Sequence, residues 1–373
     1  MQEKIRVCQV SSVHKTFDTR IFYKVCKSLS KKYEVFYVSA NAKSEVRECV
    51  HIIGVPLSLS RLKRQFQLHR VYKELLKVDA EIYQFHDPEL MSLGLKIKKK
   101  GKRVIFDSHE DVPQQILDKP YLPPRIAKLV SKVYSFFEKR RLSKYDAIIS
   151  VTPTIVDRLK TINPQCYQIT NYPINDESAH NDDGREFGRI VCFFGGVTDL
   201  WCQKDIIHAI EDIDVKYVFA GPLDEERYLE TLKKEPGYEK ANYLGVIKHS
   251  ECINIMQKSS AGLALSEYSA NMGGKRGTLG NNKLFEYMQA GIPVIATDFE
   301  LWREVVSQSD CGTLVNPHDS NAIKAAIEFY IDNPAEALRQ GDNGRVAVKE
   351  RYNWSTQEVI LFSLYKELSG NEK

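Results

Sequence analysis

The sequence of 373 residues lacks the long apolar runs that a membrane-spanning protein needs. A helix that crosses a bilayer takes roughly 20 consecutive apolar residues, and no stretch of this chain reaches that length. The first segment, MQEKIRVCQVSSVH, turns polar after one strand length, so it does not resemble a secretory signal. We therefore expect a cytoplasmic protein that is neither secreted nor membrane-spanning.

The chain also lacks cysteine pairs and metal-ligand spacings. Its eight cysteines are scattered without a Cys-x-x-Cys pair, and several lie in apolar, strand-like runs. They indicate reduced thiols in a core rather than disulfides or a zinc site. Asp212 and Asp214 form an Asp-x-Asp pair, but too few oxygen ligands surround them for a hard cation, so a turn is expected. We predict no catalytic metal and no cofactor.

Signatures of nucleotide cofactors and nucleic acids are missing as well. The first strand candidate, residues 5–11, leads into Ser11-Ser12-Val13-His14, and no Gly-x-Gly-x-x-Gly follows it. This disfavours a Rossmann oxidoreductase. Zinc-finger ligands, RNP-type aromatic motifs and an Arg/Gly tail are also absent, so we expect no nucleic-acid partner.

What the sequence contains is an alternation of short apolar runs and amphipathic segments, which is typical of parallel sheets with crossover helices. The strand candidates are residues 5–11, 33–39, 81–86, 103–109 and 147–152, then 189–196, 215–222, 261–267 and 293–298. The polar segment 171–188 separates the two series and predicts a linker. The fold class is therefore α/β, with two Rossmann-like domains, residues 1–170 and 189–350. Because open α/β sheets bind ligands beyond the carboxyl ends of their strands, we expect the domains to face each other across a cleft.

Charge is divided unevenly between the two halves. Residues 1–170 hold 32 Lys and Arg against 17 Asp and Glu, which leaves 21 against 32 for the rest. The segment 123–144 mixes many of these cations with Ile126, Leu129, Val133 and Phe136. That mixture suits an anionic membrane surface or a lipid-diphosphate acceptor. A solvated helix face explains it equally well.

The most informative stretch is NNKLFEYMQAGIPVIATD, residues 281–298. Asn281 or Asn282 can cap a helix that ends at Gly291, and a buried strand follows. A helix start offers free N–H groups to an anion, and its first turn adds Lys283 for a phosphate and Glu286 for sugar hydroxyls. An ordinary surface ion pair between Lys283 and Glu286 is the alternative.

This stretch resembles the donor site of the GT-B glycosyltransferases, in particular retaining glycosyltransferase family 4. The resemblance implies that Glu286 holds the nucleotide ribose. It also implies that the helix crossing back onto the N-terminal domain lies in residues 351–373. Many members carry a further glutamate where this chain has Thr278, and Glu267 or Asn271 would take over its contact with the sugar.

Two histidine–acid pairs follow neighbouring strand candidates and should meet at one sheet edge. They are His86-Asp87 and His109-Glu110. The resemblance implies that a histidine such as His86 contacts the transferred sugar, which makes His86, Asp87 and Glu267 the catalytic candidates.

Further candidates come from the loops. In the loop after the first strand, Arg20 suits a phosphate and Asp18 a sugar hydroxyl, although a local Asp18–Arg20 clamp is equally plausible. The resemblance implies that the same loop holds His14 over the cleft, and His109 is a further candidate on the acceptor side. The resemblance assigns the remaining donor-binding candidates to Gly195, Gly196, Lys204, Gly221 and Val246.

The sequence thus predicts a glycosyltransferase that moves a hexosyl group from a nucleotide sugar to a glycan or lipid-linked acceptor. Residues 9–38 and 261–298 resemble enzymes of bacterial capsule, exopolysaccharide and lipopolysaccharide synthesis. Another GT-B enzyme, such as a sugar-nucleotide epimerase, is one alternative. A non-catalytic protein that binds membranes or polyanions through its basic half is another. Retention is implied by the family, because His86, His109 or Asp87 could also serve as the base of an inverting enzyme.

Overall fold

The computed structural model describes residues 4–119, 121–175, 186–270 and 272–370. The chain forms two compact units: Met1–Asn171 with Trp354–Lys373, termed unit 1, and Tyr172–Asn353, termed unit 2. Much of the predicted linker lies outside the described residues, as does the site candidate Asn271. Among the described residues, no helix has both the length and the apolar character needed to cross a membrane.

Unit 1 is built on an eight-stranded sheet in the order β3-β4-β2-β1-β5-β6-β7-β8. All neighbouring strands are parallel except β3 and β4. The strands are β1 (Arg6–Ser11), β2 (Glu34–Ala40), β3 (Glu45–Arg47), β4 (Val50–Val55), β5 (Ile82–Phe85), β6 (Arg103–Ser108), β7 (Ala147–Ser150) and β8 (Cys166–Gln168). The helical segments are η1 (Thr19–Cys26), α1 (Lys27–Ser30), α2 (Arg61–Val78), η2 (Pro88–Leu90), α3 (Met91–Lys98), α4 (Val112–Leu117), α5 (Pro124–Leu142), α6 (Pro153–Lys160) and α14 (Trp354–Leu368).

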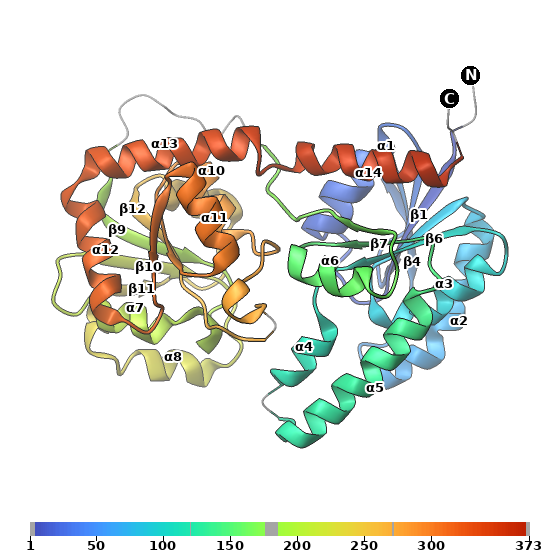
Figure 1. The fold of residues 1–373 in the computed structure, drawn as a ribbon, viewed down its shortest axis with the longest axis horizontal. Helices are drawn as coiled ribbons and strands as arrows, with labels where there is room; N and C mark the ends of the chain where they lie inside the picture. The colour runs from blue at the N-terminus through green and yellow to red at the C-terminus, as the bar shows by residue number, and fades with distance from the viewer. Residues whose placement is uncertain (1–3, 120, 176–185, 271, 371–373) are drawn as a thin grey trace. The chain divides into compact units, whose positions relative to one another are not determined.

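The two faces of this sheet are covered by different helices (Figure 1). Side chains of α2, α3 and α6 pack on one face. The π-helix η1, α1 and the late helix α14 pack on the other. Trp354 at the start of α14 is buried and donates a hydrogen bond to Ser28, so it serves packing. The last helix of the described chain is thus part of the core of the first unit.

Unit 2 has a six-stranded parallel sheet in the order β11-β10-β9-β12-β13-β14 (Figure 1). Its strands are β9 (Gly188–Phe194), β10 (Lys216–Ala220), β11 (Ala241–Tyr243), β12 (Ser259–Ala264), β13 (Val294–Thr297) and β14 (Gly312–Val315). Its helical segments are η4 (Asp199–Trp201), α7 (Gln203–Ala209), α8 (Glu226–Leu232), η5 (Pro236–Lys240), α9 (His249–Met256), η6 (Gly274–Arg276), α10 (Lys283–Ala290), α11 (Glu300–Ser309), α12 (Ser320–Asp332) and α13 (Pro334–Glu350). Two parallel-sheet α/β units confirm the predicted fold class.

Local chemistry sets the ends of the elements that carry the site. Asp18 caps η1 by accepting hydrogen bonds from the backbone N–H of Arg20 and Ile21. Asn281 accepts from the N–H of Lys283 at the start of α10, and Gly291 ends that helix with φ +74°. The eight cysteines are free thiols and most are buried, although Cys49 is exposed.

Candidate functional site

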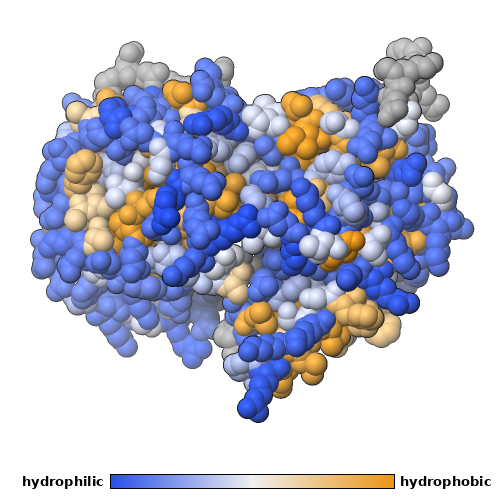
Figure 2. All heavy atoms as spheres, in the orientation of Figure 1, coloured by the Kyte–Doolittle hydropathy of each residue, from blue (hydrophilic) through white to orange (hydrophobic). Residues whose placement is uncertain are grey.

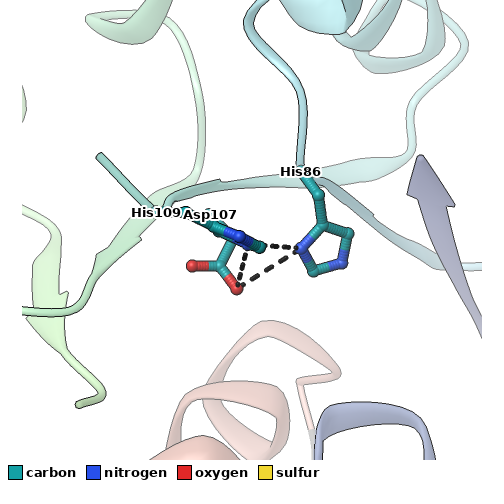
Figure 3. Close-up of side chains that lie close together, drawn as sticks. All are labelled: His86, Asp107 and His109. Carbon is teal, nitrogen blue, oxygen red and sulfur yellow. Dashed lines mark hydrogen bonds and ion pairs between the residues drawn. The ribbon is translucent and has the colours of Figure 1, made fainter. Parts of the chain in front are cut away.

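In unit 1, three side chains meet where the adjacent strands β5 and β6 end (Figure 3). His86 Nδ1 lies 3.1 Å from His109 Nε2 and 3.4 Å from Asp107 Oδ2, and His109 Nε2 lies 3.6 Å from the same oxygen. The two histidines therefore meet at one sheet edge, as the sequence predicts. The shared carboxylate, Asp107, was not among the predicted site residues.

Asp107 is fully buried and forms an ion pair with Arg20. Arg20 Nη2 lies 2.8 Å from Asp107 Oδ1 and its Nε lies 3.2 Å from Oδ2, while Nη1 donates to the carbonyl of Ile169. Burial raises the pKa of Asp107, but the positive charge of Arg20 outweighs it and holds that pKa well below its usual range. The carboxylate is therefore ionised at neutral pH.

The sequence predicts Arg20 in a loop, but in the structure it lies in the π-helix η1. Its guanidinium is buried and saturated by Asp107 and Ile169, so it is not free to bind a phosphate. The expected clamp between side chains is also replaced, because Asp18 accepts from the backbone N–H of Arg20 and not from its guanidinium. Both differences arise because a partner from β6, distant in the sequence, captures the side chain.

The two histidines differ in their access to solvent. The side chain of His86 is 0% exposed and that of His109 is 17% exposed. Burial lowers the pKa of His86 and outweighs the opposite effect of Asp107, so His86 is neutral at pH 7. A bound molecule can therefore reach His109 directly, while His86 supports it from below.

Asp87 anchors the loop after β1. Its Oδ2 accepts from Ser11 Oγ at 2.9 Å and from the backbone N–H of Ser12 at 2.6 Å. His14 Nε2 lies 3.4 Å from Asp87 Oδ1, and its ring centroid lies 4.8 Å from that of His109. Burial lowers the pKa of His14, but the effects of Asp18 and Asp87 outweigh burial, so the pKa is raised overall. His14, His109 and His86 thus form a row.

The group His86, Asp107 and His109 also has the residue types and the spacing of a metal-binding triad. The carboxylate is already neutralised by Arg20, however, and Asp107 Oδ2 accepts a further hydrogen bond from Gln84 at 3.0 Å. A metal ion bound here would share the Asp107 carboxylate with the Arg20 guanidinium, and the two positive charges would repel each other. The donor set therefore fits hydrogen-bonded histidines better than a metal, and the absence of a catalytic metal stays a prediction.

In unit 2, two glycines meet at the carboxyl ends of β9 and β10. Gly195 and Gly221 have φ values of +149° and +146°. A Cβ on Gly221 would lie 1.9 Å from the carbonyl oxygen of Gly195, and a Cβ on Gly195 would lie 2.2 Å from Lys283 Cε. These positions need glycine because backbone and a cation occupy the space of a side chain. Gly196 continues the same turn.

Lys283, at the first position of α10, lies against aromatic rings. Its Nζ is 3.5 Å from the ring centroid of Trp201 and 5.2 Å from that of Phe193. Burial lowers its pKa to about 8, against the smaller opposing effect of Glu286. Among the described residues Lys283 has no carboxylate within ion-pair distance, so the alternative of a surface pair with Glu286 is wrong.

Buried acceptors near this cation also lack partners. Asn282 Oδ1 and Thr198 Oγ1 are buried, and neither has a hydrogen-bond partner in the described part of the chain. Buried polar atoms without partners are rare in folded proteins. The start of α10 is thus electropositive, partly desolvated and unsaturated.

The remaining unit 2 candidates lie in separate surroundings. Glu267 Oε2 lies 3.0 Å from His318 Nε2, and His318 Nδ1 lies 3.3 Å from Asp205 Oδ1. Lys204 is more exposed than Lys283 and lies 3.9 Å from Asp199. Val246 is 76% exposed in the turn after β11, where an apolar contact with a base is sterically open.

His318, which the sequence did not single out, contacts the candidate Glu267. Burial lowers its pKa, but Asp205 and Glu267 outweigh this effect and raise it. It follows the Asn-Pro turn after β14, where nothing in the local pattern marks a histidine as functional. Its contact with Glu267, at 51 positions' distance, arises only in the fold.

Comparison with known families gives two matches that together span most of the chain. Residues 19–170 match the model of "Glycosyltransferase Family 4" and residues 188–347 match that of "Glycosyl transferases group 1". The first match covers most of unit 1 and the second most of unit 2.

Individual relatives agree with these families. A phosphatidyl-myo-inositol mannosyltransferase of Mycolicibacterium smegmatis is 28% identical over 84% of this chain and 78% of its own length. Among solved structures, the sucrose-phosphate synthase of Thermosynechococcus elongatus superposes with a TM-score of 0.74 at 17% identity, covering 98% of this chain and 99% of its own. Anabaena HepE in complex with UDP and glucose gives a TM-score of 0.73 at 13% identity, covering 97% and 100%. These structures show the same GT-B fold.

Proposed function

Because this chain belongs to glycosyltransferase family 4, we propose that it moves a hexosyl group, with retention of configuration, from a nucleotide-diphosphate sugar to a glycan or glycolipid. It is a glycosyltransferase with a GT-B fold. The start of α10 carries the proposal for the donor. There the structure brings together turn glycines with a cation and buried acceptors that have no partner among the described residues.

In the proposed donor complex, the diphosphate lies at the N-terminus of α10 and Lys283 neutralises its charge. Gly195, Gly196 and Gly221 allow the backbone to approach the phosphates, because no Cβ occupies that space. Asn282 Oδ1 accepts a hydrogen bond from the ligand, and Glu286, one turn along the helix, accepts from the ribose hydroxyls. Val246 contacts the base and Lys204 lends long-range positive charge.

Transfer requires the nucleoside diphosphate to leave while the sugar becomes oxocarbenium-like. Lys283 and the helix N-terminus stabilise the charge on the leaving group, and His109 with His86 behind it orients the sugar or the acceptor hydroxyl. Glu267, held by His318, takes the place of the glutamate that Thr278 replaces. No covalent nucleophile is required in this scheme.

Thermal stabilisation by nucleotides and nucleotide sugars tests the donor site. A ligand at 100 times its dissociation constant adds about 2.7 kcal/mol of stability. We expect one UDP- or GDP-sugar to stabilise the protein, and Glu286→Ala to abolish that shift. Glu300→Ala, which removes an exposed glutamate from the first turn of α11, should leave it intact. Stabilisation that persists in Glu286→Ala would contradict the proposed site.

Product analysis separates transfer from the alternative of epimerisation. An epimerase changes the nucleotide sugar without an acceptor, whereas the proposed transferase consumes it only when an acceptor is present. The anomeric configuration of the product, measured by NMR, tests retention. An inverted product would refute it while leaving the donor site in place.

A lipid-linked acceptor at an anionic membrane surface is the second part of the proposal. Helix α5 presents an exposed apolar stripe at spacings of three and four residues: Ile126, Leu129, Val130, Val133, Phe136 and Phe137. Leu129 is 63% and Phe136 is 61% exposed. Figure 2 shows apolar side chains gathered along this helix beside a hydrophilic ridge. Such an exposed stripe is unusual for a helix that faces only water.

The charges of α5 favour an anionic partner. Five exposed cations flank the stripe: Arg125, Lys128, Lys132, Lys139 and Arg140. The only acidic residue of the helix, Glu138, is buried and paired with Arg158. The surface is therefore cationic and apolar at once, as in helices that lie in the headgroup region of a bilayer. The mannosyltransferase relative is named for a lipid acceptor, which agrees with this proposal.

Vesicle binding tests the membrane contact. The protein should bind vesicles that contain phosphatidylglycerol and bind pure phosphatidylcholine weakly. Each cation near an anionic surface contributes about 1 kcal/mol, so Lys128→Glu with Lys132→Glu should weaken binding by at least about 30-fold. The control Lys233→Glu with Lys234→Glu makes the same charge change on unit 2. Equal binding by the α5 variant and the control would exclude α5 as the contact.

Membrane attachment would place the enzyme on the inner face of the cytoplasmic membrane, where lipid-linked glycans of capsule, exopolysaccharide or lipopolysaccharide synthesis are assembled. The likeness of residues 9–38 and 261–298 to surface-glycan enzymes supports this setting. A non-catalytic binding protein would also bind the vesicles, but it would not consume a nucleotide sugar.

A further inference from the structure

A row of buried polar side chains crosses the face of the unit 1 sheet that α14 covers. Gln9, Gln84 and Asp107 lie on the neighbouring strands β1, β5 and β6, and all three are fully buried. The residues around them, such as Ile82 and Leu361, are apolar. Amides and a carboxylate in such surroundings cost free energy unless they are hydrogen-bonded. Each polar atom of these three side chains therefore needs a hydrogen-bond partner.

Tyr365 of α14 bridges Gln9 and Gln84 by hydrogen bonds. Its hydroxyl oxygen lies 2.7 Å from Gln9 Nε2 and 2.8 Å from Gln84 Oε1. Gln84 Nε2 lies 3.0 Å from Asp107 Oδ2, and Gln9 Oε1 lies 2.9 Å from His86 Nε2. The side chains form a closed loop that returns to Asp107 through the histidines.

The ionised carboxylate fixes the direction of every bond in this loop. Asp107 can only accept, so Gln84 donates through Nε2 and accepts at Oε1. The Tyr365 hydroxyl therefore donates to Gln84 and accepts from Gln9 Nε2. This leaves Gln9 Oε1 as an acceptor, and the proton it receives must lie on Nε2 of His86.

The same logic extends to the second histidine. Neutral His86 with its proton on Nε2 has a bare Nδ1, so its 3.4 Å contact with Asp107 Oδ2 is not a hydrogen bond. The shorter 3.1 Å contact then requires His109 Nε2 to donate. In the neutral form of the ring, His109 then keeps its lone pair on Nδ1. Within the described residues that nitrogen has no hydrogen-bond partner, and its side chain is the more exposed of the two.

We infer that Tyr365 is a positioning residue for this histidine pair. It holds His86 in the Nε2–H tautomer and thereby makes Nδ1 of His109 the basic nitrogen offered to a bound molecule. The tautomers of the neutral rings follow from the hydrogen-bond directions that start at the ionised Asp107, and they need no ligand. Only the role of His109 toward a sugar or acceptor hydroxyl rests on the proposed function.

NMR of the full-length protein with 15N-labelled histidine rings tests the assignment directly, because protonated and bare ring nitrogens differ in chemical shift. His86→Gln and His109→Gln identify the two sets of signals. Where both rings are neutral, we expect the proton on Nε2 of each. A proton on Nδ1 of His86 in the unmodified protein would overturn the inference, and this measurement needs neither a substrate nor a Tyr365 variant.

The variant Tyr365→Phe tests the link to α14. Without the hydroxyl, Gln9 and Gln84 are no longer held in one orientation, so His86 should populate both tautomers. Tyr83→Phe is the matched control: Tyr83 is buried in β5, and its hydroxyl donates to the carbonyl of Leu75, outside the loop. It should leave both histidine signals unchanged. An unchanged His86 tautomer in folded Tyr365→Phe would refute the positioning role.

Activity gives a second readout that a purely structural role would not move. Once a donor is known, the pH dependence of kcat/KM should shift in Tyr365→Phe and stay in place in Tyr83→Phe. Gln9→Glu keeps the acceptor at His86 Nε2 but adds negative charge, so it should raise the pKa of His86 and preserve its tautomer. Failure of the donor experiments with the expected tautomers would refute the proposed function and leave this inference standing.

Discussion

The polar groups of the two units are prepared in opposite ways. In unit 1, Asp107, Arg20 and His86 find their partners within the protein, and the loop through Tyr365 leaves little freedom in their orientation. In unit 2, Lys283 lies over aromatic rings without an anion, and Asn282 Oδ1 lacks a partner among the described residues. The first arrangement is saturated without a ligand, and the second would be completed by the donor in the proposed complex. Saturation suits the groups of unit 1, whose proposed role depends on a fixed orientation. Unsaturation suits the groups of unit 2, whose proposed role is to bind the donor.

The largest effect should come from breaking the saturated side. Arg20→Met leaves the Asp107 carboxylate buried without its cation, which costs about 3–5 kcal/mol of stability. Urea unfolding followed by fluorescence would measure the loss. Arg103→Met, which removes an exposed pair with Asp146, should cost less than about 1 kcal/mol. Equal effects of the two variants would mean that the buried pair is not a structural anchor.

A glycine substitution should break the unsaturated side. Gly221→Ala places a Cβ against the Gly195 carbonyl at a φ of +146°, so backbone strain of about 1–3 kcal/mol adds to the steric clash. We expect unit 2 to lose stability and nucleotide binding together, as measured by thermal unfolding with and without UDP or GDP. Gly245→Ala also has a positive φ but open space around its Cβ, so it should cost about 1–2 kcal/mol.

The pH dependence of donor binding would sharpen the comparison. Lys283 has a pKa of about 8 in the free protein, and only its protonated form attracts a diphosphate. Binding should therefore weaken by about tenfold between pH 7 and pH 9, as calorimetry would show. Lys283→Arg stays charged throughout and should flatten this profile. A profile with the same slope in both proteins would assign the titration to another group.

The smallest effect concerns acid stability in unit 1, where two histidines oppose each other. His86 has a lowered pKa, so its contribution to stability is lost as pH falls below the unfolded value near 6.5. His14 has a raised pKa, so its contribution is present below that value and lost as pH rises through the folded pKa. His14→Gln should therefore steepen the loss of stability between pH 7 and pH 5 in urea titrations. If the pH dependence of stability is the same with and without His14, the contributions of His14 and His86 do not compensate each other.

The fold was largely predictable because buried parallel strands leave strong local patterns. The nine strand candidates correspond to strands of the structure, but β3, β8 and β11 were missed because each has three residues, too few for a periodicity. Strand β4 was missed because Gly54 interrupts its alternation, and β14 because it has only four residues and begins with a glycine.

Residues of the candidate site were predictable only where they directly follow a strand or begin a helix. His86, His109 and Lys283 satisfy that rule, and the structure brings the first two together. Arg20 carried no sign that Asp107, 87 positions away, would bury it. Tyr365 is 281 positions from Gln84, and no local pattern distinguishes it from other aromatic residues of an amphipathic helix.

The place of α14 in the chain has a consequence for synthesis in the cell. Unit 1 begins first on the ribosome, yet the helix that covers one of its sheet faces is translated after all of unit 2. Until Tyr365 emerges, Gln9 and Gln84 lack their shared partner, and the apolar residues around them stay open to water. The unit that starts first is therefore completed last, and a chain interrupted before Trp354 would release unit 2 complete and unit 1 with an exposed, aggregation-prone face.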